Sequence, residues 1–271
     1  IEFEWIDTRD PKNIENSIKE NTKLVHVESP TNPLLELCDI QAAGQVCKSK
    51  NVLLSVDNTF MSPYGQRPLE LGASITMQSS TKSLSGHSDI LGGVLATNDE
   101  ELYEKLQFML KATGGVPSPF DNWITLRSTK TLALRYQRAS DNAFELAKWL
   151  SDNQNVSKTI YPGLDSHPQH EIARKQQLSP KGDVVFGSML SIDLGDAESR
   201  DNFLRKIEIF QLAESLGSVE SLVCIPFFMT HAAVPEETKL EMGITESLVR
   251  LSIGIEDAED LKSDLSIALE K

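Results

Sequence analysis

The sequence predicts an α/β fold with a mostly parallel sheet, followed by a smaller α+β unit. In the first half, short apolar runs rich in β-branched residues alternate with stretches of helical spacing, which is typical of a parallel sheet covered by helices on both faces. In the second half, a long helical pattern precedes strand-like segments and a last helical pattern. These two patterns together indicate the fold class.

The first half contains four strand-like runs. A polar stretch over 10–22 indicates a short helix before the first of them. Prolines end the first run, because each removes a ladder donor and restricts the residue before it. A stretch of helical spacing over 38–50 separates the first two runs. The predicted strands are 24–28, 52–57, 73–77 and 94–96.

The second half begins with apolar residues at helical spacing over 132–153, which predict a long helix leading out of the first domain. We therefore expect a large domain over 1–130 and a smaller one over 131–271. Within the latter, 187–194 and 247–255 have the pattern of strands, and 257–270 that of a final helix.

Composition narrows the classes of function. With 271 residues and a formal net charge of −14, the chain is long enough for a substantial core and too acidic for a nucleic-acid surface. It contains no apolar run near the roughly 20 residues that cross a bilayer, and its start lacks the pattern of a secretory signal. We expect a cytoplasmic protein in which Cys38, Cys47 and Cys224 are reduced, since they form no CxxC.

Polar residues follow the predicted strands in three clusters. They begin at Glu28, Asp57 and Ser79. Ligands of open α/β sheets bind beyond the carboxyl ends of the strands, so these clusters are the first candidates for a site.

The second and third clusters have the composition that pyridoxal phosphate requires. Asp57 would pair with the pyridine nitrogen, and Lys82 would form the Schiff base. The hydroxyls of Ser79 and Thr81 would bind the phosphate. Taken singly, a capping Asp, a solvated Lys and a hydroxyl-rich turn are simpler interpretations of the same residues.

Seven segments together resemble one family. ESPTNP, SVDNTF, SSTKSLSGHSD, GGVPSPFDNW, AESLGSVESL, MTHAAVP and LVRLSIGIED are similar, in order and spacing, to the blocks of the Cys/Met-metabolism family of pyridoxal phosphate enzymes. The resemblance implies fold type I, like that of aspartate aminotransferase. It also implies a homotetramer, a dimer of dimers with shared active sites.

The resemblance further implies a role for each matching residue. Lys82 would be the Schiff-base lysine and general base. Thr59 would support the ring pocket beside Asp57, with Ser79 and Thr81 on the phosphate. Asn32 would lie near both cofactor and substrate. The remaining residues implied to bind substrate are Glu214, Ser215, Thr230 and Arg250. For Arg250, a surface salt bridge is the alternative, although its planar guanidinium suits a carboxylate.

Other histidines are better explained by structural roles. We expect His87 and Asp89 to fix the loop behind the lysine, and His231 to act similarly. Pro168 opposes a helix that would align His167 and His170, so we expect no metal site there.

The implied reaction is carbon–sulfur bond cleavage, which would convert L-cystathionine to L-cysteine, 2-oxobutyrate and ammonia. Glu214 favours this substrate, because a carboxylate can bind its distal ammonium. A γ-replacement synthase is the alternative. Ser83 and the apolar stretch 221–228 depart from the family pattern. The family's opening segment, with its phosphate loop and stacking tyrosine, has no counterpart here, so a noncatalytic binding protein is a second alternative.

Overall fold

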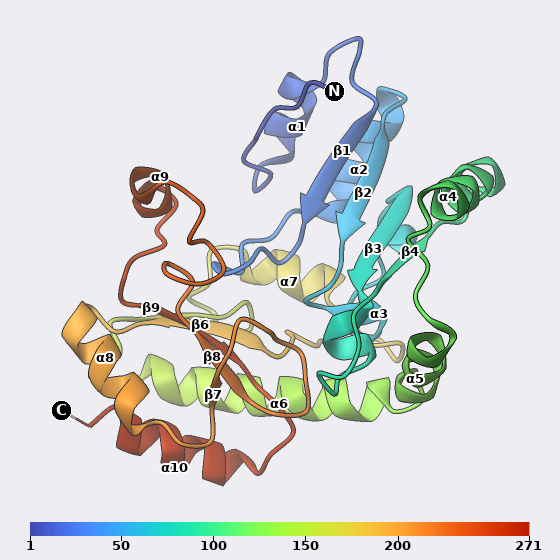
Figure 1. The fold of residues 1–271 in the computed structure, drawn as a ribbon. Helices are drawn as coiled ribbons and strands as arrows, with labels where there is room; N and C mark the ends of the chain where they lie inside the picture. Colours follow the sequence, from blue (N-terminus) through green and yellow to red (C-terminus); the bar gives the residue numbers. More distant parts are fainter. Residues whose placement is uncertain (271) are drawn as a thin grey trace.

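The computed structural model describes residues 1–270, which form two sheets (Figure 1). The first sheet consists of β1 (Leu24–Glu28), β2 (Leu53–Asp57), β3 (Ile75–Ser79) and β4 (Gly93–Ala96), in that order. The second has the order β5-β6-β9-β8-β7, with β5 (Lys158–Ile160), β6 (Met189–Asp193), β7 (Gln211–Leu212), β8 (Leu222–Cys224) and β9 (Leu248–Ser252).

Helical segments alternate with the strands. They are α1 (Pro11–Ser17), α2 (Ile40–Ser49), α3 (Ser62–Gly65), η1 (Pro68–Leu71), η2 (Ser80–Leu84), α4 (Glu100–Thr113), α5 (Pro119–Thr129), α6 (Leu132–Ser151), α7 (His170–Gln176), α8 (Ala197–Lys206), α9 (Glu236–Glu241) and α10 (Ala258–Ala268). No helix of residues 1–270 combines the length and the apolar character needed to traverse a bilayer.

The first sheet is mostly parallel, as predicted. β1, β2 and β3 run parallel, and β4 is antiparallel at the edge. Each observed strand lies within two residues of its predicted position. The carboxyl ends of the three parallel strands therefore meet at one edge.

One face of this sheet forms a core with α1 and α2. Val27, Leu54 and Val56 are buried there against apolar residues of these helices. The opposite face leaves Leu24 and Leu53 49% and 40% exposed. On the same face, Ser55 and Ile75 are 7% and 9% exposed, so the exposure does not extend over the whole face.

The second unit has a continuous core. The long helix α6 lies under the second sheet beside α10 (Figure 1). Its buried residues, such as Leu146 and Leu150, pack with Leu190 of β6 and Leu251 of β9. The predicted long helix, both predicted strands and the last helix are confirmed. α6 also contacts α3 of the first unit, and the division at 130/131 stays a prediction.

Candidate active site

The carboxyl ends of β1 to β3 bring together the residues predicted to bind a cofactor ring. Glu28, Asp57 and Met77 are neighbours in register. The Thr59 amide donates to Asp57 Oδ1 over 2.9 Å, and the Ser79 amide donates to Thr59 Oγ1 over 2.9 Å. Thr59 thus connects the carboxylate of one strand end to the turn that follows the next.

Glu28 is a site residue that the sequence analysis did not assign a role. Burial, and then the neighbouring charge of Asp57, raise the pKa of Glu28 to about 7. The signal was its position as the last residue of β1, directly opposite the last residue of β2. Glu28 is therefore protonated over a wider pH range than an exposed glutamate.

Lys82 lies in an irregular turn. It interrupts the π-type segment η2 with a non-helical backbone (φ −89°, ψ −135°). Its Nζ donates to Ser215 Oγ over 3.4 Å, a long hydrogen bond. Burial, and then the nearby Arg250, lower the pKa of Lys82. The amine is therefore biased toward its neutral, basic form.

Two features hold this turn in place. Gly217 (φ +74°) approaches it so closely that a Cβ would lie 3.0 Å from the Ser83 amide nitrogen and 3.4 Å from Lys82 Cβ. The buried guanidinium of Arg135 donates to the carbonyl oxygens of Ser83 and Leu84. Arg135 was not predicted as a site residue, and it fixes the backbone immediately after Lys82.

The arginine side of the site comes from the second sheet. Arg250 lies in β9 and is 1% exposed. Its Nη1 donates to Asn32 Oδ1 over 3.0 Å, and Nη2 donates to the carbonyl oxygens of Glu214 and Ser215 over 2.8 and 3.0 Å. Its Nε is buried and has no hydrogen-bond partner within residues 1–270. The geometry brings Asn32, Ser215 and Arg250 together, and their binding of a carboxylate stays a prediction.

Comparison with known proteins agrees with this geometry. The model of the Cys/Met metabolism PLP-dependent enzyme family matches residues 1–270. This chain belongs to that family. It is 49% identical over 271 residues to cystathionine gamma-lyase of Dictyostelium discoideum, covering all of this chain and 69% of that protein. It is 44% identical over 271 residues to cystathionine beta-lyase of Lactococcus lactis subsp. cremoris (strain MG1363), covering 100% of this chain and 70% of that one.

A solved structure gives the same result at the level of the fold. The cystathionine gamma-lyase of Lactobacillus plantarum complexed with L-serine superposes with a TM-score of 0.93 and 39% identity. The match covers 97% of this chain and 68% of that one. The expected family, its fold class and its cofactor, pyridoxal phosphate, are thereby confirmed, and the chain is a PLP-dependent enzyme.

The residues present fit the family's cofactor. Asp57 offers a carboxylate for a ring cation, and Lys82 a partly buried amine. Thr81 Oγ1 accepts from the Gly92 amide over 3.0 Å, and Ser79 Oγ makes no hydrogen bond within the described residues. The Ser79 hydroxyl can donate to a phosphate, whereas the Thr81 hydroxyl donates to the Gly92 carbonyl oxygen over 3.4 Å and would have to turn from it to do so. Their contact with the cofactor stays a prediction.

Other residues predicted to bind substrate lie around Arg250. The side chain of Glu214 is exposed, while its carbonyl holds the guanidinium. Thr230 Oγ1 and His231 Nδ1 are hydrogen-bonded over 2.9 Å. Cys224, within the stretch 221–228 that departs from the family pattern, is buried directly opposite Arg250 in the β8–β9 register. A small, uncharged side chain therefore lies beside the arginine on this strand.

The histidines have the contacts expected of structural residues. His87 Nδ1 lies 2.6 Å from the Ser85 carbonyl oxygen, and Asp89 Oδ1 accepts from Ser85 Oγ over 3.0 Å. His170 stacks on Phe186. Within residues 1–270, no three His, Cys, Asp or Glu side chains gather as metal ligands.

Proposed function

We propose that this enzyme cleaves L-cystathionine at its γ-carbon to give L-cysteine, 2-oxobutyrate and ammonia. The observation that carries the proposal is the convergence of Lys82 and Arg250 on Ser215. The Ser215 hydroxyl accepts from Lys82, and its carbonyl accepts from Arg250. A carboxylate bound to the arginine would thus place the adjacent α-carbon beside the amine.

The cofactor, when bound, supplies an electron sink for the α-carbon of the substrate. Asp57 would keep the ring nitrogen protonated, and the neighbouring Glu28 would be protonated in turn. Ser79 and Thr81 would donate to the phosphate.

Lys82 acts as the general base. Its lowered pKa leaves a larger neutral fraction near pH 7 than an exposed lysine has. It would take the proton from Cα and release it before it takes a second proton, from Cβ. The γ-sulfur then leaves with the electron pair of its bond to Cγ and is protonated to give cysteine. A partly buried base next to a bound substrate requires little rearrangement for these steps.

Arg250 and Asn32 bind the α-carboxylate. The unpartnered Nε of Arg250 is a buried donor, and such a donor is costly unless a ligand satisfies it. The Nη groups are already fixed by Asn32, Glu214 and Ser215, so the guanidinium needs little ordering when a ligand binds.

Glu214 would select cystathionine among sulfur amino acids. Glu214 directly precedes Ser215, and its exposed carboxylate can pair with the distal ammonium of the substrate. The second candidate function is γ-replacement, in which a thiol adds to the same carbon. Cys224 supports this candidate, because it lies opposite Arg250 and belongs to the stretch 221–228 that departs from the family pattern.

The test is the reaction of purified enzyme loaded with cofactor. Visible absorbance should first show covalent attachment of the cofactor at Lys82. Cystathionine should then yield equal amounts of 2-oxobutyrate and cysteine. Formation of pyruvate and homocysteine instead would indicate a β-lyase. Turnover only of an O-acylhomoserine with cysteine would support the replacement reaction.

We also propose that the protein is a cytoplasmic homotetramer. The exposed apolar residues of α4 and α5, which include Phe108, Phe120 and Trp123, support an assembly. α4 has no buried residue within residues 1–270. Light scattering after gel filtration would measure the mass, and a monomer at micromolar concentration would contradict the tetramer.

A further inference from the structure

The loop over 29–37 carries Asn32 from the end of β1 to the arginine of the second sheet. Near Asn32 the second unit holds the loop twice. Arg250 donates to Asn32 Oδ1 over 3.0 Å, and Ser191 Oγ donates to the Pro33 carbonyl oxygen over 2.8 Å. Ser191 is opposite Arg250 in the β6–β9 register, so both bonds come from one place.

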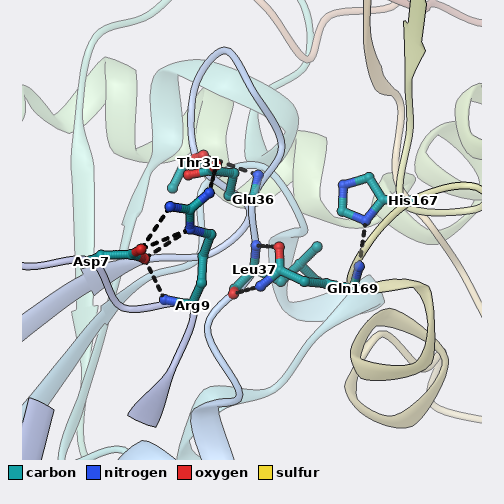
Figure 2. A network of polar contacts seen from close by, with 7 residues as sticks. All are labelled: Asp7, Arg9, Thr31, Glu36, Leu37, His167 and Gln169. Atoms are coloured by element: carbon teal, nitrogen blue, oxygen red, sulfur yellow. Dashed lines mark hydrogen bonds and ion pairs between the residues drawn. The ribbon is translucent and has the colours of Figure 1, made fainter. Parts of the chain in front are cut away.

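The far end of the loop is held by Gln169, which precedes α7. The Leu37 amide donates to Gln169 Oε1 over 2.8 Å, and Gln169 Nε2 donates to the Leu37 carbonyl oxygen. One side-chain amide thus satisfies both polar groups of one buried residue, as a neighbouring strand would. Figure 2 shows Gln169 facing Leu37 from the side opposite Arg9.

His167 positions Gln169. The backbone amide of Gln169 donates to His167 Nδ1 over 3.1 Å (Figure 2). Burial lowers the pKa of His167 to about 4, so the ring is neutral and its nitrogen accepts at physiological pH. The His167 ring therefore fixes the backbone of Gln169, from which the side chain extends to Leu37.

The loop transmits this anchor to Asn32 because it is closed on itself. The Thr31 amide donates to the Glu36 carbonyl oxygen over 2.9 Å, and the Glu36 amide donates to Thr31 Oγ1 over 3.1 Å. Thr31 precedes Asn32, and Glu36 precedes Leu37. A displacement of Leu37 would therefore move the neighbour of Asn32 as well.

We propose that Gln169 is a positioning residue that sets Asn32 against Arg250 and thereby tunes binding of the substrate α-carboxylate. The proposal rests on the proposed function for the role of Arg250. It adds a residue of the second unit, separated by 132 positions from its partner, to the machinery for substrate binding.

The test compares two small ligands of the holoenzyme with and without Gln169→Met. Glycine carries an amine and a carboxylate, and methylamine carries the amine alone. We expect the glycine dissociation constant, read from the visible absorbance of the bound cofactor, to rise about tenfold, and that of methylamine to stay within about twofold. Amide exchange over 30–38 should become faster, and exchange in β2 should not change.

A second variant separates positioning from general damage. In Gln169→Glu, the protonated carboxyl group offers Leu37 one donor and one acceptor, whereas the ionised form offers no donor. The ratio of its glycine affinity to that of the wild type should recover as the pH falls from about 7 to about 5. Asp165→Asn, at an exposed partner of His170, is the matched control and should change neither ligand.

Two results would overturn the proposal. Equal weakening of glycine and methylamine would assign Gln169 to general stability. Faster exchange over 30–38 without a change in glycine affinity would show that Asn32 does not depend on this anchor. Because neither ligand is turned over, the comparison remains valid even if the enzyme makes no 2-oxobutyrate from cystathionine.

Discussion

Lys82 and Arg250 meet at Ser215, but one is held loosely and the other firmly. Lys82 makes one long hydrogen bond, from an irregular turn, and is partly exposed. Arg250 is 1% exposed, belongs to a central strand, and is fixed by an amide and two carbonyl oxygens. A base that must move protons between two carbons needs freedom, whereas a carboxylate clamp gains affinity from being preorganised. The less constrained Lys82 therefore suits proton transfer, and the firmly held Arg250 suits recognition of the substrate.

The largest expected effect is that of Lys82→Ala. Removing the amine should lower kcat by about 10³- to 10⁴-fold, because the general base and the covalent attachment of the cofactor are lost together. The fold should persist, since the side chain makes only one long hydrogen bond. Steady-state kinetics and the visible spectrum test this, with the exposed Lys181→Ala as control. Retention of more than a tenth of wild-type kcat would contradict the assignment of the base.

Arg250→Lys should separate recognition from reactivity. A lysine cannot satisfy Asn32 and the two carbonyl oxygens at once, so we expect KM for cystathionine to rise about 10²- to 10³-fold with a smaller change in kcat. The exposed Arg174→Lys serves as the matched control. A fall in kcat at unchanged KM would show that the arginine is not a clamp for the ground state.

The sequence pointed to these two residues and to the neighbours that hold Arg250, but not to Arg135, Gln169 or the role of Glu28. The strands 24–28 and 52–57 and the residues after them follow from hydrophobic runs and prolines, which are local signals. Gln169 could not be found in this way, because its partner lies 132 residues away and an isolated glutamine has no pattern. Glu28 was visible as a strand end, but its altered pKa depends on the register with Asp57 and on burial.

Glu28 lies beside Asp57 at the strand ends of the first sheet, and the pH dependence of stability tests the interaction between them. The pKa of Glu28 is raised from 4.5 in the unfolded chain to about 7 in the fold, so its contribution to stability is complete below about pH 4.5 and is lost as the pH rises through 7. Relative to wild type, Glu28→Gln should therefore gain up to about 3 kcal/mol of unfolding free energy between these values. Urea denaturation of cofactor-free protein measures this. A constant difference across the range would disprove the coupling.

His167 supports Gln169 and, through the loop 29–37, the Asn32 that contacts Arg250. The stability that it contributes should change with pH in the direction opposite to that of Glu28. The pKa of His167 is lowered from 6.5 to about 4 by burial, so its contribution is complete above about pH 6.5 and is lost as the pH falls through 4. In His167→Asn, the amide oxygen can still accept from the Gln169 amide but does not titrate. The advantage of wild type over this variant should shrink by up to about 3 kcal/mol as the pH falls. Parallel stability curves for wild type and His167→Asn would exclude a buried neutral ring.

Ser215→Ala should have the smallest effect, because the hydroxyl contributes one long hydrogen bond to Lys82. The 3.4 Å bond to Lys82 Nζ is long, and the Ser215 carbonyl that holds Arg250 is unaffected by the substitution. We expect kcat/KM for cystathionine to fall about three- to tenfold, mostly in kcat, because the lysine loses a guide while the clamp stays intact. Ser215→Thr retains the hydroxyl and should lie closer to wild type. A loss that appears in KM alone would mean that the hydroxyl helps to bind the substrate carboxylate and does not guide Lys82.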